Sequence, residues 1–208
     1  GITQMYSSAY LLVVPPALGV KTARDLIAMA KAKPGALNFS SAGTGSGTHF
    51  AGEVFKDAAK IDVVHVPYKG SAAIVSDQIS GQVDLSMSSY TAFAPHIRSG
   101  RVRPLAVTGT ARHPLFKDLP TLDESGFKGF DAQQWYGVCG PAGLPAAVVK
   151  TLNETLATTL AAPELREKLS IEAVEPMPMS AERFGEFMRA DITRWTQIAK
   201  ARGIQLDS

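Results

Sequence analysis

A glycine-rich segment at residues 41–49 carries the strongest chemical signal in the sequence. It reads Ser-Ala-Gly-Thr-Gly-Ser-Gly-Thr-His and lies between a predicted strand and a predicted helix. Glycines let the backbone approach a ligand closely, and the first N–H groups of a helix can bind an anion. The hydroxyls of Thr44, Ser46 and Thr48 add more donors than a tight turn requires. We therefore predict a site for a carboxylate or a phosphate at this loop.

Nucleotide and hydrolase sites fit the same residues less well. Thr48 stands where a dinucleotide fingerprint has its third glycine. Asp62 precedes the apolar run of its strand, whereas a ribose-binding acid lies at the far end of the strand. Residues 69–71 show a Walker sequence in reverse order, and Ser46 is not the middle residue of a Gly-x-Ser-x-Gly elbow. The sequence offers no nucleophile–base pair or acid–base pair at these positions. We expect a site that holds its ligand, with no catalytic residues.

The histidines and the cysteine give no sign of a metal or redox centre. His49, His65, His96 and His113 lack the spacing of metal ligands, so we expect structural histidines, no metal and no cofactor. Cys139 ends an apolar run without a nearby base and is expected to pack rather than react. A single cysteine also excludes a disulfide framework within the chain.

Composition narrows the class of protein further. The chain has 208 residues, 45% of them hydrophobic, with 21 Lys and Arg against 19 Asp and Glu. This composition is typical of a globular protein with a buried core, and a net charge of +2 lacks the basic excess of a nucleic-acid binder. The apolar run at residues 10–14 meets two prolines and is too short to span a membrane.

The elements that would position the loop alternate along the first half of the chain. We predict strands at residues 10–14, 37–40, 62–66, 83–87 and 105–108, and helices at about 22–33, 47–59, 71–80 and 90–98. This alternation favours a largely parallel sheet with helices on both faces. Polar strand-to-helix junctions would then share the edge where open α/β sheets bind ligands.

The second half of the chain has too few strands for a sheet of its own. One strand is predicted at 132–138, followed by helices after Pro145, from Pro163 and after Ser180. Apolar residues recur at helical spacing in the first of these helices and from 184 to 198 in the last. We expect the stripe from 184 to 198 to form core packing rather than a cofactor site, and it is also where an incomplete domain would expose apolar surface.

In combination, the segments 37–46, 49–53 and 64–70 resemble the Bug receptors of the TctC family. These are extracytoplasmic solute receptors of tripartite tricarboxylate transporters, and the likeness runs from residue 10 to 204. It implies an α/β fold like that of type II periplasmic binding proteins. Residues 11–133 would form one complete domain with a mainly parallel sheet. Residues 134–208, with 1–10, would return to a second α/β domain whose N-terminal portion is absent.

The resemblance also implies a function. The protein would be a periplasmic receptor, not an enzyme, that closes about a hinge on a small carboxylate in an interdomain cleft. It would deliver that ligand to integral membrane subunits of a transporter; no signal peptide is present in this chain. Loop and resemblance together give the predicted ligand-binding residues: Ser41, Gly43, Thr44, Gly45, Ser46, Thr48, Tyr68, Ser71 and Ser88.

Position 88 bears on which ligand is bound. Many family members carry an acidic residue there, so Ser88 favours a plain mono- or dicarboxylate over an amino acid. Two other classes of protein stay open at this point. One is the effector-binding domain of a cytoplasmic transcription regulator, and the other is a nucleotide-dependent enzyme.

Overall fold

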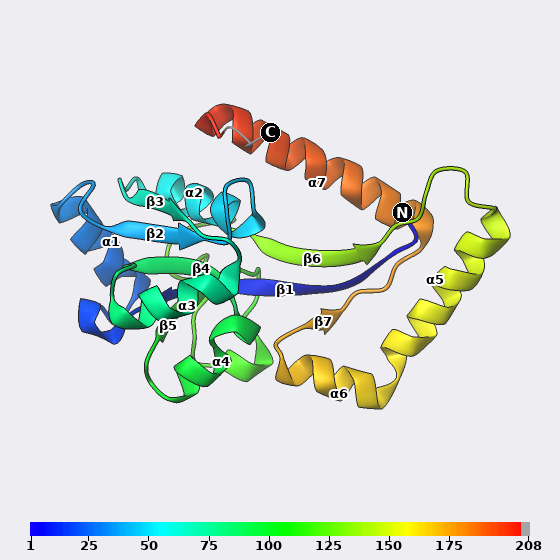
Figure 1. Ribbon diagram of the computed structural model, residues 1–208, viewed down its shortest axis with the longest axis horizontal. Helices are drawn as coiled ribbons and strands as arrows, with labels where there is room; N and C mark the ends of the chain where they lie inside the picture. Colours follow the sequence, from blue (N-terminus) through cyan, green and yellow to red (C-terminus); the bar gives the residue numbers. More distant parts are fainter. Residues whose placement is uncertain (205–208) are drawn as a thin grey trace. The chain divides into compact units, whose positions relative to one another are not determined.

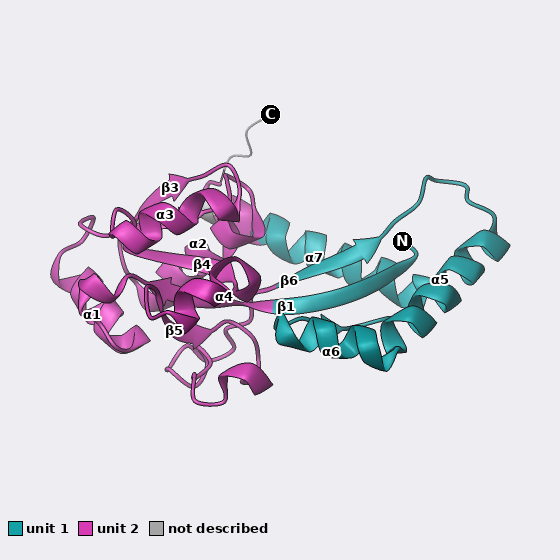
Figure 2. Cartoon of the chain, turned by 60° about the horizontal axis from the view of Figure 1, so that its bottom comes forward, with its two compact units in different colours: residues 1–8, 134–197 teal, residues 9–133, 198–208 magenta. Residues whose placement is uncertain are grey.

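The computed structural model describes residues 1–204 (Figure 1). The chain forms two compact units, which Figure 2 shows in different colours. Unit 1 contains residues 1–8 and 134–197, and unit 2 contains residues 9–133 and those from 198 onward. The assignment of these units to the two domains of the resembled family stays a prediction.

Unit 2 is a five-stranded sheet with helices between its strands. The strands follow the order β3-β2-β4-β1-β5. β2 pairs in parallel with β3 and β4, whereas β1 is antiparallel to both β4 and β5. The mainly parallel α/β sheet expected from the sequence is therefore confirmed, with one reversed strand inside it. The elements are β1 (Thr3–Val14), α1 (Ala23–Ala32), β2 (Asn38–Ser41), α2 (Gly47–Ala59), β3 (Val64–Pro67), α3 (Ser71–Ser80), β4 (Leu85–Ser89), α4 (Tyr90–Arg98) and β5 (Arg103–Val107). Short 3-10 helices lie at Pro16–Leu18 and Pro114–Phe116.

The start of α1 shows how local sequence fixes these elements. The Thr22 hydroxyl accepts a hydrogen bond from the Asp25 N–H at 3.1 Å, and the Asp25 carboxylate accepts one from the Thr22 N–H at 2.9 Å. This capping box satisfies donors that a helix start leaves unpaired. It also sets the helix phase so that Leu26 and Ala30 are buried.

Unit 1 combines the first half of β1 with two further strands and three helices. β1 pairs with β6 (Gln133–Val138) and, through Tyr6 and Ser7, with the two-residue strand β7 (Glu175–Pro176). The helices are α5 (Ala146–Ala161), α6 (Pro163–Ile171) and α7 (Ala181–Arg202). Among residues 1–204, no helix has the length and apolar character that crossing a membrane requires.

The apolar stripes of unit 1 are only partly buried. Phe184 of α7 is fully buried, with its ring edge-on to Trp135 at 5.7 Å between centroids. Ile192, two turns further along the same stripe, is 65% exposed, and Val148 and Leu152 of α5 are 41% and 39% exposed. The core packing predicted for the stripe from 184 to 198 therefore holds at Phe184 and is wrong at Ile192. Periodicity shows which side chains share a helix face, but not whether another element covers it.

Candidate anion-binding site

The loop between β2 and α2 is held in shape by its own hydrogen bonds. The Ser46 hydroxyl donates to the Gly43 carbonyl at 2.7 Å and accepts the His49 N–H at 3.3 Å, which caps α2. The Ala42 N–H donates to the Thr48 hydroxyl at 2.8 Å. Gly43 and Gly45 have φ values of 131° and 77°, a region that favours glycine. The hydroxyls predicted as ligand contacts therefore also build the loop.

Several backbone donors of this loop are left for a ligand. Within the described residues 1–204, the N–H groups of Thr44, Gly47 and Thr48 have no hydrogen-bond acceptor in the protein. Gly47 and Thr48 are the first two residues of α2, where N–H groups have no partner within the helix. These donors suit an anion.

Two more helices begin at the same edge of the sheet. β3 runs into α3 and β4 runs into α4, and both strands are parallel neighbours of β2 (Figure 1). The residues before these helices, Gly70 and Ser89, make no side-chain cap. Because each helix start carries partial positive charge, three such ends along one edge attract an anion.

The second predicted segment lies against the loop. The Tyr68 N–H donates to the Ser41 carbonyl at 3.0 Å, and the Gly70 N–H donates to the Ala42 carbonyl at 3.1 Å. Ser71 is the first residue of α3. The structure thus brings the segment 68–71 and the glycine-rich loop together, while their ligand contacts stay predictions.

The Tyr68 side chain already has a partner. Its hydroxyl donates to the Asp77 carboxylate at 2.6 Å, on the second turn of α3. Burial and this hydrogen bond raise the pKa of Tyr68 to about 12. The hydroxyl is therefore protonated at neutral pH and is engaged with Asp77 rather than free to donate to a ligand.

Three of the predicted ligand contacts are buried, whereas a side chain that meets a ligand from solvent would be exposed. These are Ser41, Thr48 and Ser88. Ser41 is fully buried and Thr48 is 5% exposed. Ser88 is fully buried opposite Leu11 of β1, and its hydroxyl has no hydrogen-bond partner among the described residues. The partly exposed residue next to α4 is Ser89. Direct ligand contact by Ser88 stays a prediction.

Two histidines support the loop, which the sequence did not indicate. The His49 and His65 rings stack at 3.9 Å between centroids, with 8° between their planes. Burial lowers the pKa of both, that of His65 to about 4. Two positions could have indicated this support. His49 comes three residues after the residue that caps α2, and His65 lies on β3, paired with Phe39 of β2. In residues 1–204, no group of three metal-ligating side chains lies close enough to hold an ion.

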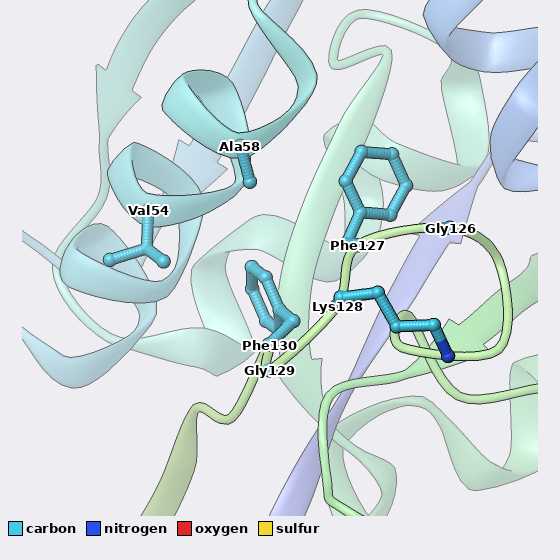
Figure 3. A pocket seen from close by; sticks show the side chains of 7 residues that line it. All are labelled: Val54, Ala58, Gly126, Phe127, Lys128, Gly129 and Phe130. Atoms are coloured by element: carbon cyan, nitrogen blue, oxygen red, sulfur yellow. The ribbon is translucent and has the colours of Figure 1, made fainter.

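A separate hollow of about 360 Å³ lies elsewhere on unit 2. Val54 and Ala58 line it from the second half of α2, together with residues 126–130 (Figure 3). Phe127 and Phe130 make much of its wall apolar, and Lys128 pairs with Asp123 at 2.9 Å. Because the anion site lies at the other end of α2, this hollow is not part of it.

The fold is that of the periplasmic α/β binding proteins. Solved structures support this. The chain has a TM-score of 0.92 and 34% identity to Rpa4515 of R. palustris with adipate, covering 98% of this chain and 68% of that one. The periplasmic binding protein BugD gives a TM-score of 0.88 and 29% sequence identity, covering 98% of this chain and 69% of that one.

Residues 1–204 match the family model described as the tripartite tricarboxylate transporter family receptor, TctC. The chain belongs to this family, which confirms the resemblance. It is 30% identical to protein BugT of Bordetella pertussis over 196 residues, or 94% of this chain. The chain spans 60% of the length of that relative.

Proposed function

We propose that this chain is the carboxylate-binding part of a periplasmic solute receptor, which has no chemical step and serves a tripartite tricarboxylate-type transporter. One observation carries the proposal. The unpaired N–H groups of the glycine-rich loop lie at a sheet edge where α2, α3 and α4 all begin. The family match supports a receptor over a transcription regulator's effector domain or a nucleotide-dependent enzyme.

The charge at the site suits a carboxylate held by backbone dipoles. His49 and His65 have lowered pKa values and are neutral at pH 7. Attraction therefore comes from the helix starts, each contributing about 0.3–2 kcal/mol, and from direct N–H donors. A carboxylate offers two acceptor oxygens to such donors.

The size of the ligand is inferred from a relative. Rpa4515, which shares 34% identity over almost the whole chain, was solved with adipate. An acidic ligand with a second carboxylate at the end of an aliphatic chain is therefore our first choice. Two further steps stay predictions: closure of a second domain on the ligand about a hinge, and delivery of the ligand to membrane subunits.

Calorimetry with matched ligands tests the proposal. The protein carrying this chain is titrated with adipate and with adipamide, which has the same length but no charge. We expect saturable binding of adipate and none of adipamide at the same concentrations, because the helix starts favour the anion. Equal affinities for the two compounds would contradict an anion site, and so would failure of every dicarboxylate from succinate to adipate.

A further inference from the structure

The stacked histidines contact the glycine-rich loop at two separate points. The Nδ1 atom of His49 accepts the Gly45 N–H at 3.1 Å. The Nε2 atom of His65 lies 2.7 Å from the Ser41 hydroxyl, which in turn accepts the Gly43 N–H at 3.2 Å. One ring therefore holds the middle of the loop, and the other holds its start.

The rings themselves are fixed from several sides. Phe39 of β2 stacks on His65 at 4.7 Å between centroids, and His65 stacks on His49. His49 is 6% exposed and projects from the first turn of α2, whose start Ser46 caps. The hydrogen-bonding atoms of both rings are thus placed by strand and helix, the stiffest parts of unit 2.

The histidine contacts add to the loop's own hydrogen bonds, because the Gly45 N–H finds its acceptor on His49 and not within the loop. Gly43 and Gly45 adopt positive φ values, and glycine has more backbone conformations to lose than any other residue. Fixing the backbone of a residue costs conformational entropy. A loop that was ordered only when the ligand arrived would take that cost from the affinity.

The His49 contact with the loop requires a neutral ring. Nδ1 of His49 is an acceptor only while it carries no proton, and a second positive charge would face the first across 3.9 Å. The charged groups that act on the rings are Glu53 and Lys56 of α2, which pair with each other at 2.8 Å. Burial keeps both rings neutral at pH 7 by lowering their pKa values.

We infer that His49 and His65 are positioning residues for ligand binding. They touch no ligand themselves but hold Ser41, Gly43 and Gly45 in the conformation that presents the loop's N–H groups to the anion. This inference rests on the proposed function and goes beyond it, because it assigns affinity to residues behind the binding surface.

Replacing each histidine by Asn and, separately, by Gln tests the inference with matched variants. Asn places an oxygen near the position of Nδ1, and Gln places one near that of Nε2. We expect His49→Asn to keep the adipate affinity within about threefold, and His49→Gln to weaken it at least about tenfold, or 1.4 kcal/mol. For His65 the order reverses, with His65→Gln retaining affinity and His65→Asn losing it. All four variants lose a ring, so ring loss alone cannot produce this crossed pattern.

The crossed pattern is decisive in either direction. Equal losses for Asn and Gln at both positions would show that the rings act only by packing, and unchanged affinity in all four would show that they do not matter. Thermal unfolding of each variant identifies any that fail to fold. If a variant at one position does not fold, the role of that histidine is tested instead by the NMR measurement on the native protein described next.

A measurement without ligand separates this inference from the proposed function. In isotope-labelled protein, a nitrogen–nitrogen coupling between the Gly45 amide and His49 Nδ1 reports the hydrogen bond directly. We expect this coupling, and slow exchange of the Gly45 amide, in the free protein at pH 7. An absent coupling with fast exchange would overturn the inference even if adipate binds. If the coupling is present but no dicarboxylate binds, the proposed function fails while the support of the loop stands.

The pH profile gives a second readout that packing would not produce. As the pH falls, protonation of His49 removes the acceptor for the Gly45 N–H, and the lowered pKa of His49 places this loss below the usual pKa of histidine. We expect adipate affinity to fall more steeply in the native protein than in His49→Asn, which keeps an acceptor that does not titrate in this range. Titration of adipate itself is common to both proteins and cancels in the comparison. Parallel profiles would contradict the inference.

Discussion

The two units of the chain bury their apolar side chains to very different extents. Almost all of the core lies in unit 2, where α2, α3 and α4 pack against the sheet. Among the described residues, unit 1 buries few apolar side chains: Ile2, Leu160, Ala173 and Phe184. It also exposes several large ones: Tyr136, Val148, Leu152, Ile171, Met177 and Ile192.

The difference shows that regular helices are not evidence of a complete core. α5 and α7 are long and have apolar stripes, yet residues such as Leu152 and Ile192 face solvent. The binding loop belongs to unit 2, where β2 and β4 are largely buried and β2 pairs with both β3 and β4. A binding surface requires precise placement, and unit 2 is the part of the chain that provides it.

The largest effect is expected at the center of unit 1. Phe184→Ala should lower the free energy of unfolding by about 3–5 kcal/mol, because it removes the largest side chain of a small core. Hydrogen exchange should show the loss in residues 1–8 and 134–197. Ile192→Ala, on the same helix, is the control and should change stability by less than about 0.5 kcal/mol. Equal losses for the two would mean that unit 1 has no core around Phe184.

The same substitution, Leu to Ala, can be made in one helix of each unit to compare how much each leucine contributes to stability. Leu26 of α1 is fully buried, whereas Leu152 of α5 is 39% exposed. We expect Leu26→Ala to cost about 2–5 kcal/mol and Leu152→Ala less than about 1 kcal/mol in denaturant unfolding. A cost for Leu152→Ala that matches Leu26→Ala would remove the contrast between the units.

A pair of glycines separates binding from stability within unit 2. Gly45 and Gly81 have φ values of 77° and 78°, and only Gly45 lies in the loop. Valine at either position should cost about 1–2 kcal/mol of stability because of the left-handed backbone. Only Gly45→Val should weaken adipate binding, by at least about tenfold, as measured by calorimetry. Weakened binding in Gly81→Val as well would assign the effect to stability.

The smallest effects are expected from two buried serines. The Ser8 hydroxyl in unit 1 donates to the Ala173 carbonyl at 2.9 Å, whereas the Ser86 hydroxyl in unit 2 has no partner among residues 1–204. Ser8→Ala should cost about 1 kcal/mol, and Ser86→Ala should be neutral or stabilising by up to about 1 kcal/mol. Thermal unfolding of both variants measures the difference. A clear loss for Ser86→Ala would show that its hydroxyl has a partner in solution.

Much of unit 2 could be predicted from the sequence. The expected helices at 71–80 and 90–98 have these bounds in the structure, and α1 lies within the helix expected at about 22–33. These features depend on residues near each other in the chain. Caps, glycine stops and buried strands leave local patterns that can be read directly.

Features that depend on distant partners could not be predicted. A buried strand has the same pattern in either direction, so the antiparallel pairing of β1 depends on β4 and β5. β7 has only two residues and exists because Tyr6 and Ser7 pair with it. The contacts of His49 and His65 with the loop also join separate segments, and each histidine alone resembles any structural histidine.

The shared strand β1 has a consequence for synthesis on the ribosome. Its second half pairs with β4 and β5, so the sheet of unit 2 can assemble once residue 107 has emerged. Its first half waits longer, because its partners are β6, which ends at residue 138, and β7 at residues 175–176. At about 5–20 residues per second, the ribosome needs several seconds to make the chain from residue 107 to residue 176. Until β7 has emerged, one edge of the first half of β1 lacks its partner, and an unpaired strand edge invites association with other chains.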